Sequence, residues 1–149
     1  MGRIDHAQYV ESWSSGFGLD ELIEKLDEMA REERVDIFVA PFWGMPTAAL
    51  YLALEDHPRA HIHMAPWFRD KPLLAEAKAT GSLTSFPNPY DERDTRLVPY
   101  AELRRCVFVA NVPQMKLGDF MRRNPDATLV EAFYRPGRKS SLAILDVPK

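Results

Sequence analysis

The sequence of 149 residues contains one cysteine, Cys106, which excludes a disulfide bond within the chain. No apolar run approaches the roughly 18 residues that a membrane-spanning helix needs, and the first residues lack the apolar core of a secretory signal peptide. The formal net charge of −3 is small, so electrostatics give no reason to expect a nucleic acid as the main partner.

The overall composition is typical of a folded domain. Hydrophobic residues make up 46% and charged residues 28% of the chain, which are ordinary values for a soluble globular protein. The length predicts a single domain over residues 1–149, with a core that needs no disulfide to hold it. Cys106 lies in the apolar run 106–110 and is predicted to be a small buried side chain.

Apolar periodicity and turn residues divide the chain into helices and strands. Helices are predicted at 19–34, 46–56, 72–81 and 115–124, and strands at 35–40, 60–65, 105–112, 128–134 and 141–147. The helix at 46–56 is apolar almost all round and is therefore expected to be well buried. Residues 82–99 are rich in Pro, Asn, Asp and Thr and are expected to form a long irregular loop, which is often a functional feature.

The order of these elements predicts the fold class. Strands that alternate with helices favour an α/β fold, here a three-layer sandwich with a mostly parallel sheet and helices on both faces. The last two strands are separated by a Pro-Gly turn at 135–138 and should form a C-terminal antiparallel hairpin.

Ligands of open parallel sheets bind beyond the carboxyl ends of the strands, so residues that follow the predicted strands are the candidate binding residues. These are Trp43, Gly44, Thr47, Trp67 and Asn111. Trp43 and Trp67, together with Phe68, could form an aromatic platform for a sugar or another flat apolar face. The alternative is that these aromatic side chains only cover an edge of the sheet.

Two further groups of residues are weaker candidates for a binding site. Ser15, Gly16 and Gly18 precede the first helix, where free backbone N–H groups could hold an anion, although a plain structural turn is the simpler interpretation. His61 and His63 alternate on a predicted strand and should project from one face. They could bind zinc only with a third ligand, and buried or surface histidines are the simpler interpretation. No catalytic residue, metal site or cofactor is predicted.

One segment resembles a known family. Gln8-Tyr9-Val10-Glu11-Ser12-Trp13-Ser14-Ser15-Gly16-Phe17-Gly18 is similar to a Tyr-x-Glu-x-Trp-x-Ser-Gly-Tyr-Gly-like segment of bacterial membrane glycosyltransferases. These belong to the dolichyl-phosphate-mannose protein mannosyltransferase-like family, in which the segment follows the last membrane span and opens a soluble C-terminal domain. This chain departs from the family at Ser14, where relatives often carry Pro, and at 41–43, where their loop is usually small and polar.

The resemblance implies that the chain is part of a longer enzyme whose catalytic acids lie in the membrane portion. The chain would then be a non-catalytic extramembrane accessory domain on the extracytoplasmic side, with residues 1–15 as a tether. Its partners would be the membrane-spanning part of the parent chain and a lipid-linked sugar donor or an acceptor, which it would position. The alternatives are a free-standing small α/β ligand-binding protein of unknown ligand and, on the histidines alone, a metal-dependent enzyme.

Overall fold

The computed structural model describes residues 18–40, 47–85, 93–111, 117–134 and 140–149. Along the chain these residues form α2 (Leu19–Glu32), β1 (Val35–Val39), α3 (Thr47–Leu54), β2 (Ala60–Met64), α4 (Ala75–Thr80), β3 (Ser82–Ser85), β4 (Arg96–Pro99), the short 3-10 helix η2 (Tyr100–Glu102), β5 (Arg105–Asn111), α5 (Leu117–Arg123), β6 (Thr128–Tyr134) and β7 (Ser140–Asp146).

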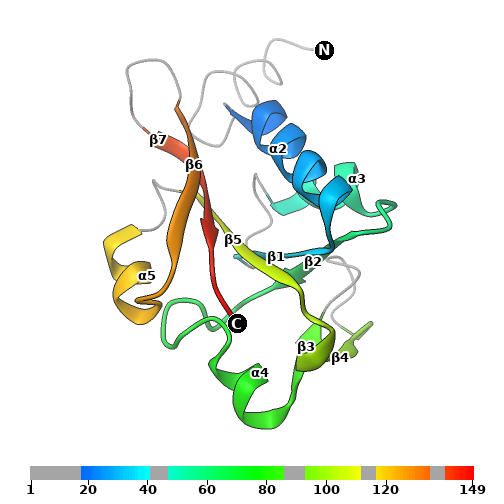
Figure 1. Ribbon diagram of the computed structural model, residues 1–149, viewed down its shortest axis with the longest axis vertical. Helices are drawn as coiled ribbons and strands as arrows, with labels where there is room; N and C mark the ends of the chain where they lie inside the picture. Colours follow the sequence, from blue (N-terminus) through cyan, green and yellow to red (C-terminus); the bar gives the residue numbers. More distant parts are fainter. Residues whose placement is uncertain (1–17, 41–46, 86–92, 112–116, 135–139) are drawn as a thin grey trace.

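The described strands form a five-stranded sheet in the order β2-β1-β5-β7-β6 and a separate two-stranded sheet of β3 and β4. β1 pairs in parallel with β2 and with β5, whereas β7 is antiparallel to both β5 and β6. Figure 1 shows α2 and α3 together on one side of the large sheet, away from α4 and α5. The α/β class, the layered arrangement and the C-terminal antiparallel hairpin are therefore confirmed.

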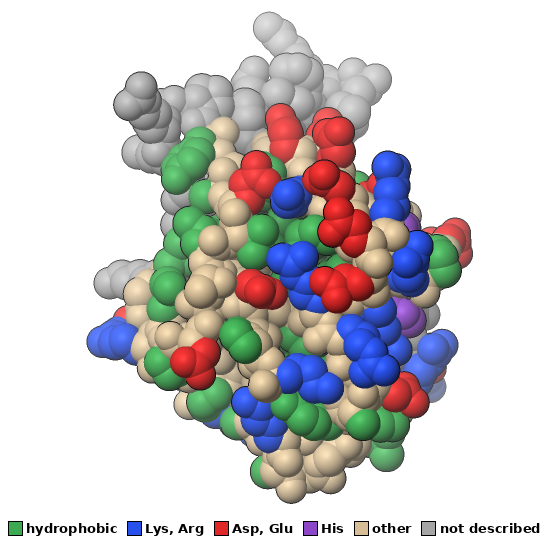
Figure 2. Space-filling view, viewed as in Figure 1, with side chains coloured by type: hydrophobic (Ala, Val, Ile, Leu, Met, Phe, Trp, Pro, Cys, Tyr) green, Lys and Arg blue, Asp and Glu red, His purple; other side chains and the backbone are tan. Residues whose placement is uncertain are grey.

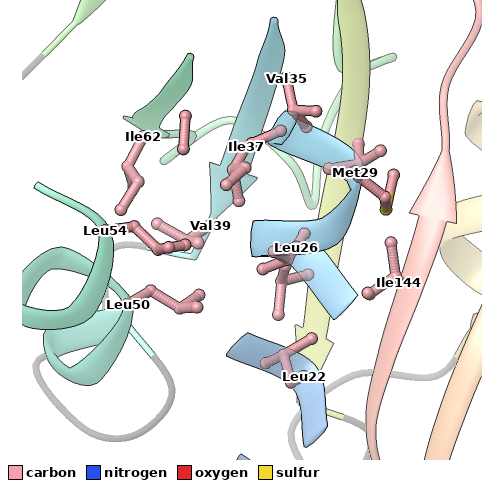
Figure 3. Close-up of a cluster of buried hydrophobic side chains, with 14 of the residues drawn as sticks. Leu22, Leu26, Met29, Val35, Ile37, Val39, Leu50, Leu54, Ile62 and Ile144 are labelled. Carbon is pink, nitrogen blue, oxygen red and sulfur yellow. The ribbon is translucent and has the colours of Figure 1, made fainter. Parts of the chain in front are cut away.

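The first side of the sheet is covered by the apolar face of α2, which begins after Gly18. Apolar side chains three and four residues apart on this helix point towards β1 and α3, as expected for an amphipathic helix. Figure 3 shows this α2-side core, with Leu22, Leu26, Met29, Val35, Ile37, Val39, Leu50, Leu54, Ile62 and Ile144 labelled. All of these side chains are buried, so this cluster ties both helices to the sheet.

The second side of the sheet has its own core, which contains the buried rings of Phe38, Phe68, Phe108 and Phe120. The rings of Phe108 and Phe120 stack with centroids 4.5 Å apart, and Phe68 lies 5.4 Å from Phe108. Cys106 is buried in the same cluster, which confirms its prediction as a core side chain. Burial raises the pKa of its thiol to about 12, so this cysteine is an inert core residue.

α3 is less buried than its sequence suggests. Although the helix is apolar almost all round, only Thr47, Leu50, Tyr51 and Leu54 are buried, and Leu52 is 71% exposed. The expectation of a well-buried helix holds only for one face of α3, because the helix lies in an outer layer where one face contacts the sheet and α2 and the other faces outward. Within the described ranges, no helix has the length and apolarity needed to cross a membrane.

The segment expected to be an irregular loop contains regular structure at both ends. Ser82–Ser85 pairs antiparallel with Arg96–Pro99, so the prediction was wrong for these eight residues, while 86–92 lie outside the described residues. Gly81 ends α4 with a φ of 82° and its carbonyl accepts a hydrogen bond from the N–H of Tyr100 at 2.9 Å. This bond closes the base of the β3–β4 hairpin beside the large sheet.

Candidate functional site

The most unusual residue of the sheet is Asp36, a carboxylate in the otherwise apolar strand β1. Its side chain is fully buried. Since side chains alternate along a strand, Asp36 lies on the same face as Phe38, opposite the α2-side core. A buried carboxylate is costly unless it is hydrogen-bonded and its charge is compensated, so its partners decide what the site can do.

Asp36 has three partners, and they come from three parts of the chain. Oδ1 accepts hydrogen bonds from Nη2 of Arg34 at 3.0 Å and from Nε2 of His63 at 2.9 Å. Oδ2 accepts one from the backbone N–H of Arg104, just before β5, at 2.9 Å. Burial alone would raise the pKa of Asp36, but the bonds from His63, Arg104 and Arg34 outweigh burial and lower the pKa below its ordinary value. The group is therefore a carboxylate at neutral pH.

His63 connects this carboxylate to the β3–β4 hairpin. It lies on β2, is 3% exposed, and its Nδ1 is 2.8 Å from Oγ of Ser85, the last residue of β3. A carboxylate can only accept hydrogen bonds, so Nε2 of His63 must carry a proton. In the neutral ring Nδ1 is then the acceptor, and the Ser85 hydroxyl donates to it. Asp36, His63 and Ser85 thus form one continuous chain of hydrogen bonds, which we call the buried relay.

The buried relay opens into a cavity of about 480 Å³ at the free edge of β2. The cavity, here called the edge pocket, lies between β2, the C-terminal end of α3 and the β3–β4 hairpin. Its walls include Arg34, Tyr51, Leu54, Glu55, Asp56, Ala60, His61, Ile62, His63, Ser85, Arg96, Leu97, Val98 and Glu102. A pocket of this size fits a small molecule, and its walls carry charges of both signs.

The electrostatic surroundings of the edge pocket are mixed. Its walls carry Arg34 and Arg96 as well as Glu55, Asp56 and Glu102. Figure 2 shows acidic and basic side chains intermixed on the face of the molecule that carries α2. Burial, together with the positive charge of Arg34, lowers the pKa of His61. His61 is therefore neutral at pH 7 and can exchange hydrogen bonds with a ligand without adding charge.

Two of the residues predicted to bind ligand have internal partners. The Thr47 hydroxyl donates a hydrogen bond to the backbone oxygen of Ala40 at 2.9 Å and is buried, so it ties the start of α3 to the end of β1. The indole N–H of Trp67 donates to the carbonyl of Leu73 at 2.9 Å, and its ring packs against the core. Phe68 is 2% exposed and cannot serve as an open aromatic platform.

The remaining predicted residues lie elsewhere. Asn111 is half-buried at the end of β5 and is not part of the edge pocket. Gly18 precedes α2 with a φ of 78°, and a Cβ on it would lie 2.6 Å from Cβ of Phe133. The close packing against Phe133 therefore explains why this position has a glycine. Trp43, Gly44, Ser15 and Gly16 lie outside the described residues.

The sequence interpretation missed the buried relay. His61 and His63 do share a face of β2, as predicted, but the partner of His63 is a carboxylate 27 residues earlier and a serine 22 residues later. The available signal was Asp36 itself, because a charged residue inside a buried strand requires a partner. Among the described residues, no three His, Cys, Asp or Glu side chains are close enough to hold a metal ion.

Comparison of the chain with protein-family models, with curated proteins and with solved structures found no match.

Proposed function

We propose that this chain is an extramembrane accessory domain of a membrane glycosyltransferase that uses a lipid-linked sugar donor. The observation that carries the proposal is the segment from Tyr9 to Gly18, which is similar to the segment that opens the soluble domain in that family. Its last residue, Gly18, directly precedes α2 and packs on Phe133 of β6. The end of the segment and the start of an α/β domain thus coincide, as the resemblance requires.

In this proposal the domain does not transfer sugar itself. The family's catalytic acids belong to the membrane portion, and the domain would lie on the extracytoplasmic side, anchored through the parent chain. Its partners would be the membrane-spanning part and either the acceptor or the lipid-linked donor. The edge pocket, about 480 Å³ in volume and lined by charged and polar side chains, is the place where part of such a ligand would be held.

A second candidate is a free-standing small α/β ligand-binding protein. The observation that favours it is the same edge pocket, together with two separate buried cores that cover both faces of the sheet. Such a domain needs no membrane partner to fold. The two candidates therefore differ in the size and the location of the protein in the cell.

An immunoblot of fractionated source cells, with an antibody raised against this chain, tests the proposal. The accessory-domain function predicts a band several-fold larger than 17.1 kDa that is confined to the membrane fraction. A soluble band near 17.1 kDa would contradict it and support the free-standing ligand-binding protein. As a further check, the isolated chain should transfer no sugar from a polyprenyl-phosphate-linked donor, and measured turnover would contradict the proposal that sugar transfer belongs to the membrane portion.

A further inference from the structure

The buried relay has the three parts that activate a serine hydroxyl. A nucleophilic hydroxyl needs a base within hydrogen-bond reach and a third group that orients the base. Here Oγ of Ser85 lies 2.8 Å from Nδ1 of His63, and Nε2 of the same ring lies 2.9 Å from Oδ1 of Asp36. Asp36 is itself fixed by Arg34 and by the backbone of Arg104. The ring is thus held with its free lone pair towards the hydroxyl.

A positively charged residue faces Ser85 across the β3–β4 hairpin. Ser85 on β3 is directly opposite Arg96 on β4, and opposite residues of an antiparallel pair project from the same face. Both residues line the edge pocket. An exposed guanidinium beside the nucleophile can stabilise negative charge that develops on a carbonyl oxygen during attack.

We infer that Ser85, His63 and Arg96 form an acyl-transfer site that hydrolyses a small ester bound in the edge pocket. Ser85 and Arg96 would contact the reacting atoms, and His63 would move the proton. Asp36 is a positioning residue, because it acts through the His63 ring. This inference goes beyond the proposed function and does not depend on it, since the site lies within this chain.

The chemistry uses only the ester and water. Oγ of Ser85 bonds to the carbonyl carbon while its proton passes to Nδ1 of His63 and the carbonyl π electrons move to oxygen, near Arg96. When the C=O re-forms, the bond to the alcohol oxygen breaks and that oxygen takes the proton from His63. A water molecule then repeats both steps on the acyl-serine, which releases the carboxylic acid and restores the hydroxyl.

The mixed charge of the walls limits the substrate class. Arg34 and Arg96 are balanced by Glu55, Asp56 and Glu102, so the pocket favours neither a strongly anionic nor a strongly cationic ligand. Polar walls and a volume of about 480 Å³ favour a small, polar ester over a long-chain lipid ester.

Labelling with a small alkyl fluorophosphonate tests the site, because this probe reacts with activated serines and releases fluoride. Intact mass and peptide mapping of the whole chain should show one adduct, located on Ser85. Ser85→Ala should give none. The matched control is Thr84→Ala, since Thr84 is the adjacent residue of β3 and its exposed side chain projects from the opposite face. This variant should be labelled at the wild-type rate.

Two further variants test the roles of the other groups. His63→Gln should be labelled about 100-fold more slowly, because general-base assistance is lost. Arg96→Gln alters an exposed residue, keeps the fold, and should also slow labelling about 100-fold. A wild-type chain that gains no adduct, or an adduct on another residue, would overturn the inference. An unchanged rate for Arg96→Gln would overturn the role of Arg96.

The role of Asp36 has its own readout. In Asp36→Asn the side-chain amide can donate a hydrogen bond to Nε2, which leaves the ring proton on Nδ1 and removes the acceptor of the Ser85 hydroxyl. Labelling of this variant, compared with the wild type under conditions where both are folded, should therefore slow by more than about 10-fold. Asp36→Glu keeps a carboxylate that can only accept from Nε2, and it should recover part of the rate. If folded Asp36→Glu is labelled no faster than folded Asp36→Asn, Asp36 is only structural.

Discussion

Nε2 of His63 on β2 lies 2.9 Å from Oδ1 of Asp36 on β1. In the parallel register Asp36 faces His61 and His63 faces Phe38, so this side-chain bond crosses the two strands diagonally. β2 is at the edge of the sheet and pairs with β1 alone. This side-chain hydrogen bond therefore attaches the edge strand to its neighbour in addition to the backbone hydrogen bonds, so the stability of β2 depends in part on the buried relay.

Replacing Asp36 should be strongly destabilising. Asp36→Asn removes the charge that compensates Arg34 and places an amide where Oδ1 and Oδ2 now accept four hydrogen bonds. Breaking a buried ion pair in this way should lower the free energy of unfolding by about 3 kcal/mol, measured by urea unfolding at neutral pH. Asp70→Asn, an exposed control, should change it by less than about 0.5 kcal/mol. Equal effects of the two substitutions would contradict this account.

The same carboxylate should make the fold sensitive to acid. Hydrogen bonds lower the pKa of Asp36 below its ordinary value of 3.8, so the folded state holds the charged form more strongly than the unfolded state does. Its stabilisation is complete above the unfolded-state pKa and is lost as the pH falls through the folded-state pKa. Between about pH 4 and pH 2 the unfolding free energy of the wild type should fall more steeply than that of Asp36→Asn. Parallel pH profiles would exclude Asp36 as a source of the acid sensitivity.

Much of the fold could be predicted because the signals are local. α2, β1 and β5 have apolar patterns that follow from the geometry of one helix or strand, and the structure reproduces them within a few residues. The two strands of the C-terminal hairpin are separated by a local turn signal. The two strands within 82–99 have no such signal, because each has only four residues and their pairing depends on contacts beside the large sheet.

The buried relay could not be predicted because it depends on contacts between residues that are far apart in the sequence. It joins residues from β1, β2 and β3, and the last of these strands was itself missed. The rule that ligands bind at the carboxyl ends of parallel strands also directed attention to Thr47, Trp67 and Asn111. Asp36 is instead near the start of β1, and its partner Arg104 precedes β5. A site formed beside an edge strand by an added hairpin falls outside that rule.

Gly18 should tolerate no side chain. Gly18→Ala combines a left-handed backbone, φ 78°, with a Cβ 2.6 Å from that of Phe133. The strain of the backbone costs about 1 kcal/mol and the overpacking about 1–3 kcal/mol more. Gly81→Ala is the matched control, because its φ is 82° but its Cβ would have no neighbour within 4 Å. Thermal and urea unfolding should show a clearly larger loss for Gly18→Ala, and equal losses would mean that the contact with Phe133 costs nothing.

Asn124 should be needed to join α5 to the segment that precedes α4. Its buried side chain accepts a hydrogen bond from the backbone N–H of Leu73 at 2.8 Å and donates one to the carbonyl of Phe120 at 3.0 Å. Asn124→Ala leaves the buried Leu73 N–H without an acceptor, which should cost about 1–3 kcal/mol in urea unfolding. Asp126→Asn, at an exposed position two residues later, is the control and should change the unfolding free energy by less than about 0.5 kcal/mol. If the alanine variant unfolds at the same urea concentration as the wild type, another group or a water molecule must accept the hydrogen bond from the Leu73 N–H. The Asn124 side chain would then not be needed to join the two segments.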